Sequence, residues 1–109
     1  MRLCSISVDL DEITCYSQIH GLTPEGACPA VYDLALGRMR DFAASAALPL
    51  TLFVIARDLE RSENVVALRQ MVSDGHEIGN HTLDHLYDLT RREGAEQCRQ
   101  IELASARIE

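Results

Sequence analysis

The strongest constraint on the fold is the alternation of short apolar runs with longer helical patterns along the 109 residues. Residues 3–8 alternate in polarity and favour a strand, and residues 50–55 (LTLFVI) form the nearly unbroken apolar run typical of a parallel strand covered on both faces. A third, brief strand is expected within residues 76–81 (HEIGNH). Helical patterns separate and follow these segments, which predicts parallel βαβ units and an α/β fold.

Three amphipathic helices are expected from apolar residues that recur at helical spacing. The first covers residues 30–47 and ends before Pro49, the second begins near Ser62 and ends before Gly75, and the third covers residues 91–109. The predicted apolar stripe of the first helix consists of Val31, Leu34, Ala35, Met39, Phe42 and Ala46. Residues 12–29, with several Gly and Pro residues near their end, are expected to form a long loop.

Two architectures fit this order of elements, namely a doubly wound sheet and part of a βα-barrel. Both place ligand sites at the carboxyl ends of the parallel strands. Asp9 and Asp11 follow the first strand, and His81 and His85 follow the third. These four side chains are therefore expected to converge.

Composition and charge exclude several classes of partner. The net charge of −7 argues against nucleic-acid binding, which needs clustered cations. The longest uncharged stretch, residues 42–56, is 15 residues long, which is shorter than the ~20 apolar residues of a membrane span. The first residues lack the pattern of a signal peptide, so a cytoplasmic location is expected. The four cysteines, which lack C-x-x-C spacing, are expected to be reduced thiols: Cys4, Cys15, Cys28 and Cys98.

The spacing of His81 and His85 places both imidazoles on one face if this segment is a helical turn. Together with a carboxylate they would form the ligand set of a catalytic zinc ion or of a non-haem iron oxygenase. Surface histidines at a helix start are the alternative interpretation of this short motif. Asp9, Asp11 and Glu12 repel one another unless a cation neutralises them, although carboxylates after a strand also act as caps.

Three segments in the same order resemble the polysaccharide deacetylases, metal-dependent carbohydrate esterases with a distorted βα-barrel. They are SVDLDE (residues 7–12), TLFVIARDLE (residues 51–60) and GHEIGNHTLDH (residues 75–85). The third is similar to the histidine motif of that family almost letter for letter. The resemblance implies an α/β fold of parallel βαβ units that form part of such a barrel.

The resemblance also implies a chemistry and its residues. Asp11, His81 and His85 would hold a divalent metal, most simply zinc, with cobalt, nickel or iron as alternatives. Asp9 would act as the catalytic base, and a metal-bound water would attack an acyl carbonyl. Glu12 and Asp84 would be additional ligands or would support the ligands from behind, with Asp84 orienting an imidazole; a solvated surface position is the alternative for Asp84. His76 is expected to be a turn or surface residue.

The implied reaction is hydrolysis of a carbon–nitrogen bond other than a peptide bond, by deacetylation or deformylation of an N-acylated amino sugar or polysaccharide. Later family motifs, an arginine-proline pair, an aspartate and a late histidine, do not occur in residues 1–109, so this single domain is expected to be the N-terminal portion of a longer barrel. Its exposed strand edge would favour self-association. Two alternatives stay open: a non-catalytic half-barrel that binds or assembles, and, ranked lower, an iron-dependent oxygenase.

Overall fold

A computed structural model describes residues 3–23 and 29–109 of the chain. Its centre is a parallel sheet of three strands in the order β1-β2-β3, formed by β1 (Ile6–Asp9), β2 (Leu50–Val54) and β3 (Glu77–Asn80). The predicted α/β class and the parallel direction of the strands are confirmed. The described residues form an open sheet, which is consistent with part of a βα fold.

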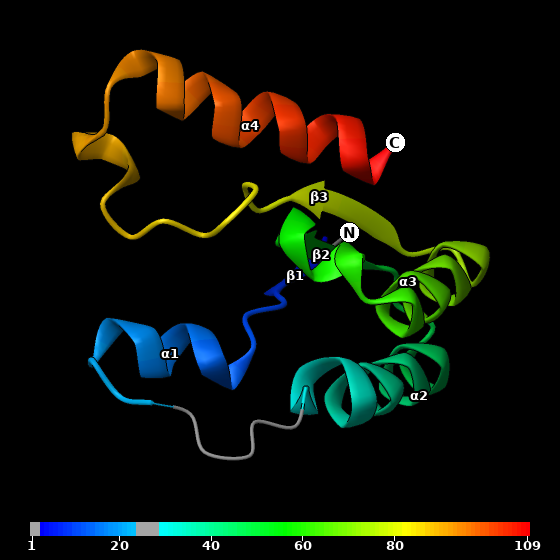
Figure 1. Cartoon of the computed structure of the whole chain (residues 1–109). Coiled ribbons are helices and arrows are strands. Elements are labelled where there is room, and N and C mark those ends of the chain that lie inside the picture. Colours follow the sequence, from blue (N-terminus) through cyan, green and yellow to red (C-terminus); the bar gives the residue numbers. More distant parts are fainter. Residues whose placement is uncertain (1–2, 24–28) are drawn as a thin grey trace.

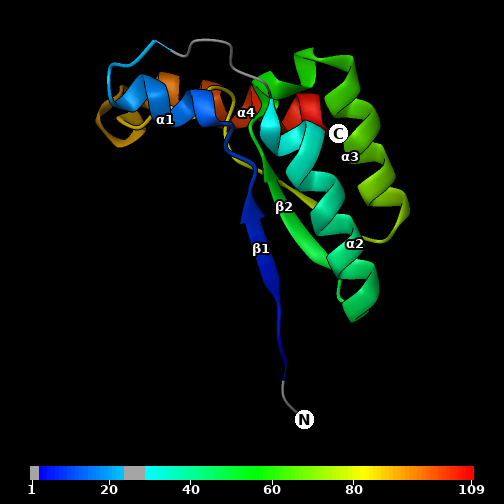
Figure 2. The ribbon, with the colours of Figure 1, turned by 90° about the horizontal axis from the view of Figure 1, so that it is seen from below.

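The helices follow the strands in the predicted alternation. They are α1 (Ile13–Ile19), α2 (Leu36–Ala46) with a preceding π-helical segment η1 (Val31–Ala35), α3 (Ser62–Ser73) and α4 (Gly94–Ile108). Two short 3₁₀ segments, η2 (Ala56–Glu60) and η3 (Leu89–Arg91), lie between them. Helices α2 and α3 lie side by side, whereas α4 runs past β3 and η2 (Figures 1 and 2). Among the residues that the structure describes, no helix is long and apolar enough to cross a bilayer.

The segment expected to be a long loop contains helix α1, so that part of the prediction is wrong. The turn-forming residues begin only at Gly21, and the seven residues of α1 contain neither Gly nor Pro. Gly21 adopts a φ of 64° and ends the helix. The amide of Leu22 donates to the carbonyl of Ser17, as expected for a helix that ends in a left-handed residue. Residues 24–28, including Cys28, lie outside the described residues, and Cys4, Cys15 and Cys98 form no disulfide with one another.

The predicted apolar stripe of the α2 region is also partly wrong. Tyr32, Leu36 and Ala43 are buried against the sheet, whereas Leu34 and Phe42 are 51% and 54% exposed. The π-helical segment has i→i+5 hydrogen bonds, which rotate the following helix relative to the 3.6-residue period used for the prediction. Each of the buried residues Tyr32, Leu36 and Ala43 lies one residue after a position of the predicted stripe.

The core lies between one face of the sheet and helices α2 and α3. Val8, Leu52 and Ile78 share one row across the three strands, and Leu52 is completely buried. Leu68 and Met71 of α3 complete this cluster. Because successive residues of a strand point to opposite faces, Asp9, Phe53 and Gly79 in the next row point away from this core.

The end of α3 fixes where β3 begins. Gly75 has a φ of 93°, and the amide of His76 donates to the carbonyl of Met71, so Gly75 is the left-handed residue predicted after the helix. His76 itself is 9% exposed, and its Nδ1 accepts a hydrogen bond of 3.2 Å from the amide of Leu50. The expectation of a turn or surface histidine is therefore wrong, because this ring satisfies the first amide of β2.

Candidate metal centre

The carboxyl ends of β1 and β3 bring two distant parts of the sequence to one place. Asp9 pairs in register with Phe53, and Phe53 pairs with Gly79, so the three strands end nearly level. Asp11 and His81 each follow by two residues. The pairing continues past the strands, because the amides of Leu10 and His81 donate to the carbonyls of β2. The side chains of Asp11 and His81 therefore extend the face that lies away from α2 and α3.

Asp11, His81 and His85 form a compact cluster. His81 Nε2 lies 3.3 Å from Asp11 Oδ1, and His85 Nε2 lies 3.5 Å from Asp11 Oδ2. One ligand atom from each residue lies within 4.8 Å of the other two, and the centroids of the two imidazole rings are 4.7 Å apart. The structure thus brings together the three residues that the resemblance implies as ligands.

These distances suit a divalent ion. Two ligands about 2.0–2.1 Å from a tetrahedral zinc ion lie about 3.3 Å apart, close to the separations between Asp11 and the imidazoles. Asp11 Oδ1 and His81 Nε2 are both buried and have no hydrogen-bond partner among the described residues. Such unpartnered buried atoms are unfavourable unless something else satisfies them. Two nitrogens and one carboxylate, facing one point, form a donor set that fits a catalytic metal with an open position.

The segment from His81 to His85 is a loop and not a helical turn, so the predicted local geometry is wrong. Thr82 has a φ of 67° and His85 a φ of 53°, both in the left-handed region. The imidazoles approach each other because the backbone reverses between them. The amide of His85 donates to Thr82 Oγ1 at 3.1 Å, which stabilises this reversal.

Asp9 lies beside the cluster but is open to solvent. Its side chain is 58% exposed, compared with 12% for Asp11. Its Oδ2 atom is 3.9 Å from His81 Nε2. Asp9 is therefore placed at the edge of the site, where a carboxylate can exchange protons with a reactant and with water.

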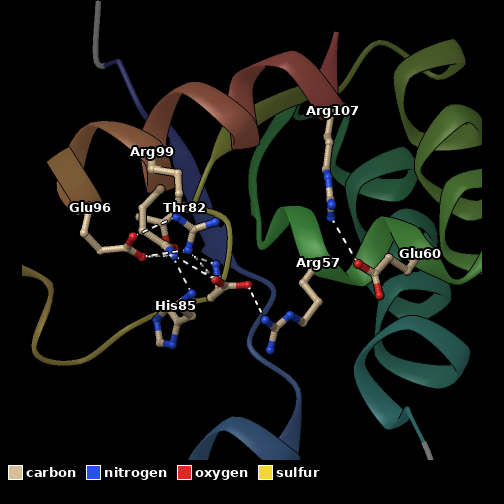
Figure 3. A network of polar contacts seen from close by, with 9 residues as sticks. Arg57, Glu60, Thr82, His85, Glu96, Arg99 and Arg107 are labelled. Atoms are coloured by element: carbon tan, nitrogen blue, oxygen red, sulfur yellow. Dashed lines mark hydrogen bonds and ion pairs between the residues drawn. The ribbon is translucent and has the colours of Figure 1, made fainter.

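Glu12 and Asp84 are occupied by other partners. Glu12 is 7% exposed, and its Oε1 accepts hydrogen bonds of 3.1 Å from the amides of Val31 and Tyr32, at the start of the second helical region. Asp84 faces α4: its carboxylate accepts from Gln100 Nε2 at 2.7 Å, and Arg57 Nη2 lies 2.6 Å away. Arg99, a third partner of Asp84, and the neighbouring loop are drawn in Figure 3. Glu12 thus supports the backbone at the start of η1, and the Asp84 carboxylate links its loop to side chains of η2 and α4.

Two aromatic rings border the histidines. Phe53 lies 6.3 Å from His81 between ring centroids, and Tyr87 packs edge-on against His85 at 4.8 Å. Gly79 makes room for Phe53, because a Cβ at this position would lie 2.6 Å from two atoms of the ring. Burial and the nearby charge of Asp11 raise the pKa of Tyr87. The rings partly shield the imidazoles from water.

A thiol and a carboxyl group near the cluster have altered proton affinities. Burial and the charges of Asp58 and Asp11 raise the pKa of Cys15, so this thiol stays protonated at neutral pH. Burial and the charge of Glu12 raise the pKa of Asp58 to about 6. Burial and Asp58 raise the pKa of Tyr32. The acidic surroundings favour a cation over further negative charge.

Sequence reasoning missed several residues that build this site. Asn80 accepts from the amide of Thr82 at 2.7 Å and donates to Ser105 Oγ at 2.9 Å. Gln100 is completely buried in α4. Asn80 carries a signal, since it is the last residue of the strand, next to His81, but a glutamine within a helical pattern carries none.

Comparison with known proteins identifies the family of this chain. A sequence profile described as polysaccharide deacetylase matches residues 36–109. This stretch covers most of the chain and includes His81 and His85. The chain belongs to the polysaccharide deacetylase family. The match begins after Asp9 and Asp11, so the assignment of these two residues depends on the structural convergence described above.

One relative is a peptidoglycan-N-acetylglucosamine deacetylase from Bacillus cereus. It is 36% identical over 63 residues, which are 58% of this chain. The aligned region spans 27% of the length of that relative. No solved structure matches the chain significantly.

Proposed function

We propose that this chain carries the metal-binding residues of a hydrolase that removes the acyl group from an N-acylated amino sugar or polysaccharide. The observation that carries the proposal is the convergence of Asp11, His81 and His85, with Asp9 at the open edge. Membership of the deacetylase family supports the reaction class. The name of the bacterial relative supports an N-acetylated sugar as substrate.

In this proposal Asp11, His81 and His85 hold a divalent ion, zinc in the simplest case. Such an ion supplies Lewis acidity, which acidifies a water and polarises the acyl oxygen. Cobalt, nickel and iron accept the same ligands, so the donor set alone does not choose between them. The buried, unpartnered atoms of Asp11 and His81 support metal binding independently of the family.

Asp9 is the proposed catalytic base. Hydrolysis joins the oxygen of water to the acyl carbon and breaks the carbon–nitrogen bond, which yields a carboxylate and a free amine. Asp9 takes the proton that the water loses, and its exposed carboxylate is accessible for this transfer. The open edge beside Asp9 is where the acyl group would lie.

The test is metal binding by the purified chain, followed by acetate release. We expect about one Co²⁺ or Zn²⁺ per chain for the wild type and a large loss of affinity for His81→Ala. His20→Ala is the matched control, because His20 is an exposed histidine at the end of α1. A wild-type chain that binds no metal would refute the proposal.

Acetate release from N-acetylglucosamine oligomers tests the reaction itself. Asp9→Asn should keep the metal and lose at least about 100-fold in rate, as expected for loss of a general base. A metal-loaded wild type that releases no acetate would instead favour the non-catalytic binding module. A cytoplasmic location and self-association through the sheet edge remain predictions from the sequence.

A further inference from the structure

The loop that carries the two histidines has an unfavourable backbone. Thr82 and His85 both have positive φ angles, and Thr82 is β-branched, for which this region is especially unfavourable. Each such residue destabilises a chain, so this conformation persists only where the surroundings impose it. The contacts of this loop therefore decide whether the imidazoles meet.

One set of contacts comes from β3 and η2. The amide of Thr82 donates to Asn80 Oδ1, and the amides of Ala56 and Arg57 donate to the carbonyls of Thr82 and Leu83, each at 3.0 Å. Leu83 is 5% exposed and packs against Ala56. These contacts hold the first half of the loop.

The second set comes from α4, where Arg99 and Ala104 contact Asp84 and Leu83 and Gln100 makes the hydrogen bonds. The amide of Leu83 donates to the backbone carbonyl of Gln100 at 3.0 Å. The amide of Asp84 donates to Gln100 Oε1 at 2.9 Å, and Gln100 Nε2 donates to the carboxylate of Asp84 at 2.7 Å. Gln100 is 0% exposed, and the network that it joins lies between the helix and His85 (Figure 3).

The chemistry of this contact requires an amide side chain. Asp84 presents a donor in its backbone and an acceptor in its side chain, and only a group with both functions satisfies the two at once. Leucine at position 100 would leave the amide of Asp84 without its partner. Glutamate would keep the acceptor but would face the carboxylates of Asp84 and Glu96, which both accept from Gln100 Nε2.

We infer that Gln100 is a positioning residue for the metal centre: through Leu83 and Asp84 it holds the loop in the conformation that brings His81 and His85 to Asp11. This inference rests on the proposed function, because it concerns the same metal site. Gln100 itself does not contact the three ligands. Changes to partners of metal ligands typically weaken metal affinity about 10–100-fold, and we expect about tenfold for loss of the Gln100 side chain.

The experiment compares Gln100→Leu and Gln100→Glu with the wild-type chain. The matched control is Gln97→Leu on the same helix, because Gln97 donates to the carbonyl of Arg92, away from the loop. Co²⁺ affinity and the visible absorption spectrum of bound Co²⁺ are measured, since the spectrum reports ligand geometry. Circular dichroism and urea unfolding of the metal-free proteins report the fold.

The inference predicts about tenfold weaker Co²⁺ binding and an altered spectrum for Gln100→Leu, a smaller change for Gln100→Glu, and neither for Gln97→Leu. Unchanged Co²⁺ affinity in both Gln100 variants would overturn the inference about Gln100 but would leave the proposed metal centre in place. Equal losses in Gln97→Leu, or unfolding of both Gln100 variants beside a folded control, would also overturn it, because Gln100 would then support the fold in general. A wild-type chain without Co²⁺ binding refutes the proposed function instead.

Discussion

Replacement of Glu12 by glutamine separates two roles that the sequence alone leaves open for this residue, metal ligand and helix cap. In the structure Glu12 Oε1 accepts two amide hydrogen bonds of 3.1 Å at a buried helix start. A net hydrogen bond to a charged group contributes about 1.5–3 kcal/mol and a neutral one about 0.5–1.5 kcal/mol. Loss of the charge therefore removes about 2 kcal/mol over both bonds, and relief of repulsion with Asp58 offsets part of it. We expect Glu12→Gln to lower the free energy of unfolding by about 1–2 kcal/mol.

Urea unfolding of the metal-free protein measures this change, and a Zn²⁺ titration with a chelator competitor measures the affinity. The capping role predicts a less stable protein with Zn²⁺ affinity within about twofold of the wild type, whereas loss of a ligand weakens metal affinity more than tenfold. Glu102→Gln is the control, because Glu102 is an exposed acid on α4. Wild-type stability combined with a large loss of affinity would refute the reasoning and make Glu12 a ligand.

Four further predictions concern stability and assembly. Burial and the charge of a neighbouring acid raise the pKa of Asp58 to about 6, so the protonated carboxyl stabilises the fold below about pH 4 and this contribution is lost as the pH rises through 6. Asp58→Asn should thus raise the free energy of unfolding by about 1–2 kcal/mol at neutral pH, after allowance for solvent screening, and by much less near pH 4 in parallel urea titrations. Ala47, with a φ of 51° at the end of α2, is strained, so Ala47→Gly should raise stability by about 1 kcal/mol and Gly75→Ala should lower it; equal midpoints in thermal unfolding would contradict this. His76→Leu should lower stability by about 1–3 kcal/mol without a change in metal affinity, because it leaves the buried amide of Leu50 without a partner. Within the described residues β1 and β3 each pair on one side only, so the sedimentation coefficient should rise with concentration in the micromolar range, and a constant monomer value would count against this.

Elements with a strong period were predictable from the sequence. The apolar run of β2 and the stop at Gly75 are local signals, and the structure has a strand and a helix end there. The convergence of Asp11 with the histidines followed from one topological rule, because parallel strands with helical crossovers end on the same side. This rule needs only the order of the elements and not their packing.

Features that depend on departures from the regular period were not predictable. The π-helical segment before α2 rotates the buried face by about one residue, so Tyr32 is buried, Val31 is only partly buried and Phe42 is exposed. The positive φ angle of Thr82 runs against its sequence signal, because β-branched residues avoid this region, and histidine at position 85 is only a weak signal for it. Tertiary contacts impose these angles, and a pattern confined to one segment cannot report them.

The three proposed ligands differ in how firmly the chain holds them before a metal binds. Asp11 lies between two anchored neighbours: Leu10 is completely buried and donates to the carbonyl of Phe53, and Glu12 is bonded to the second helical region. The amide of His81 continues the sheet through a bond of 3.0 Å to Val54. The backbone of His85 bonds through its amide to the strained loop itself, and its ring contacts Asp11 and Tyr87, so its position depends on the contacts that hold the loop, those of α4 included. In the proposed metal centre, Asp11 and His81 are therefore preorganised at the ends of the strands and His85 is adjustable, so we expect the contacts of helix α4 with the loop to change metal affinity.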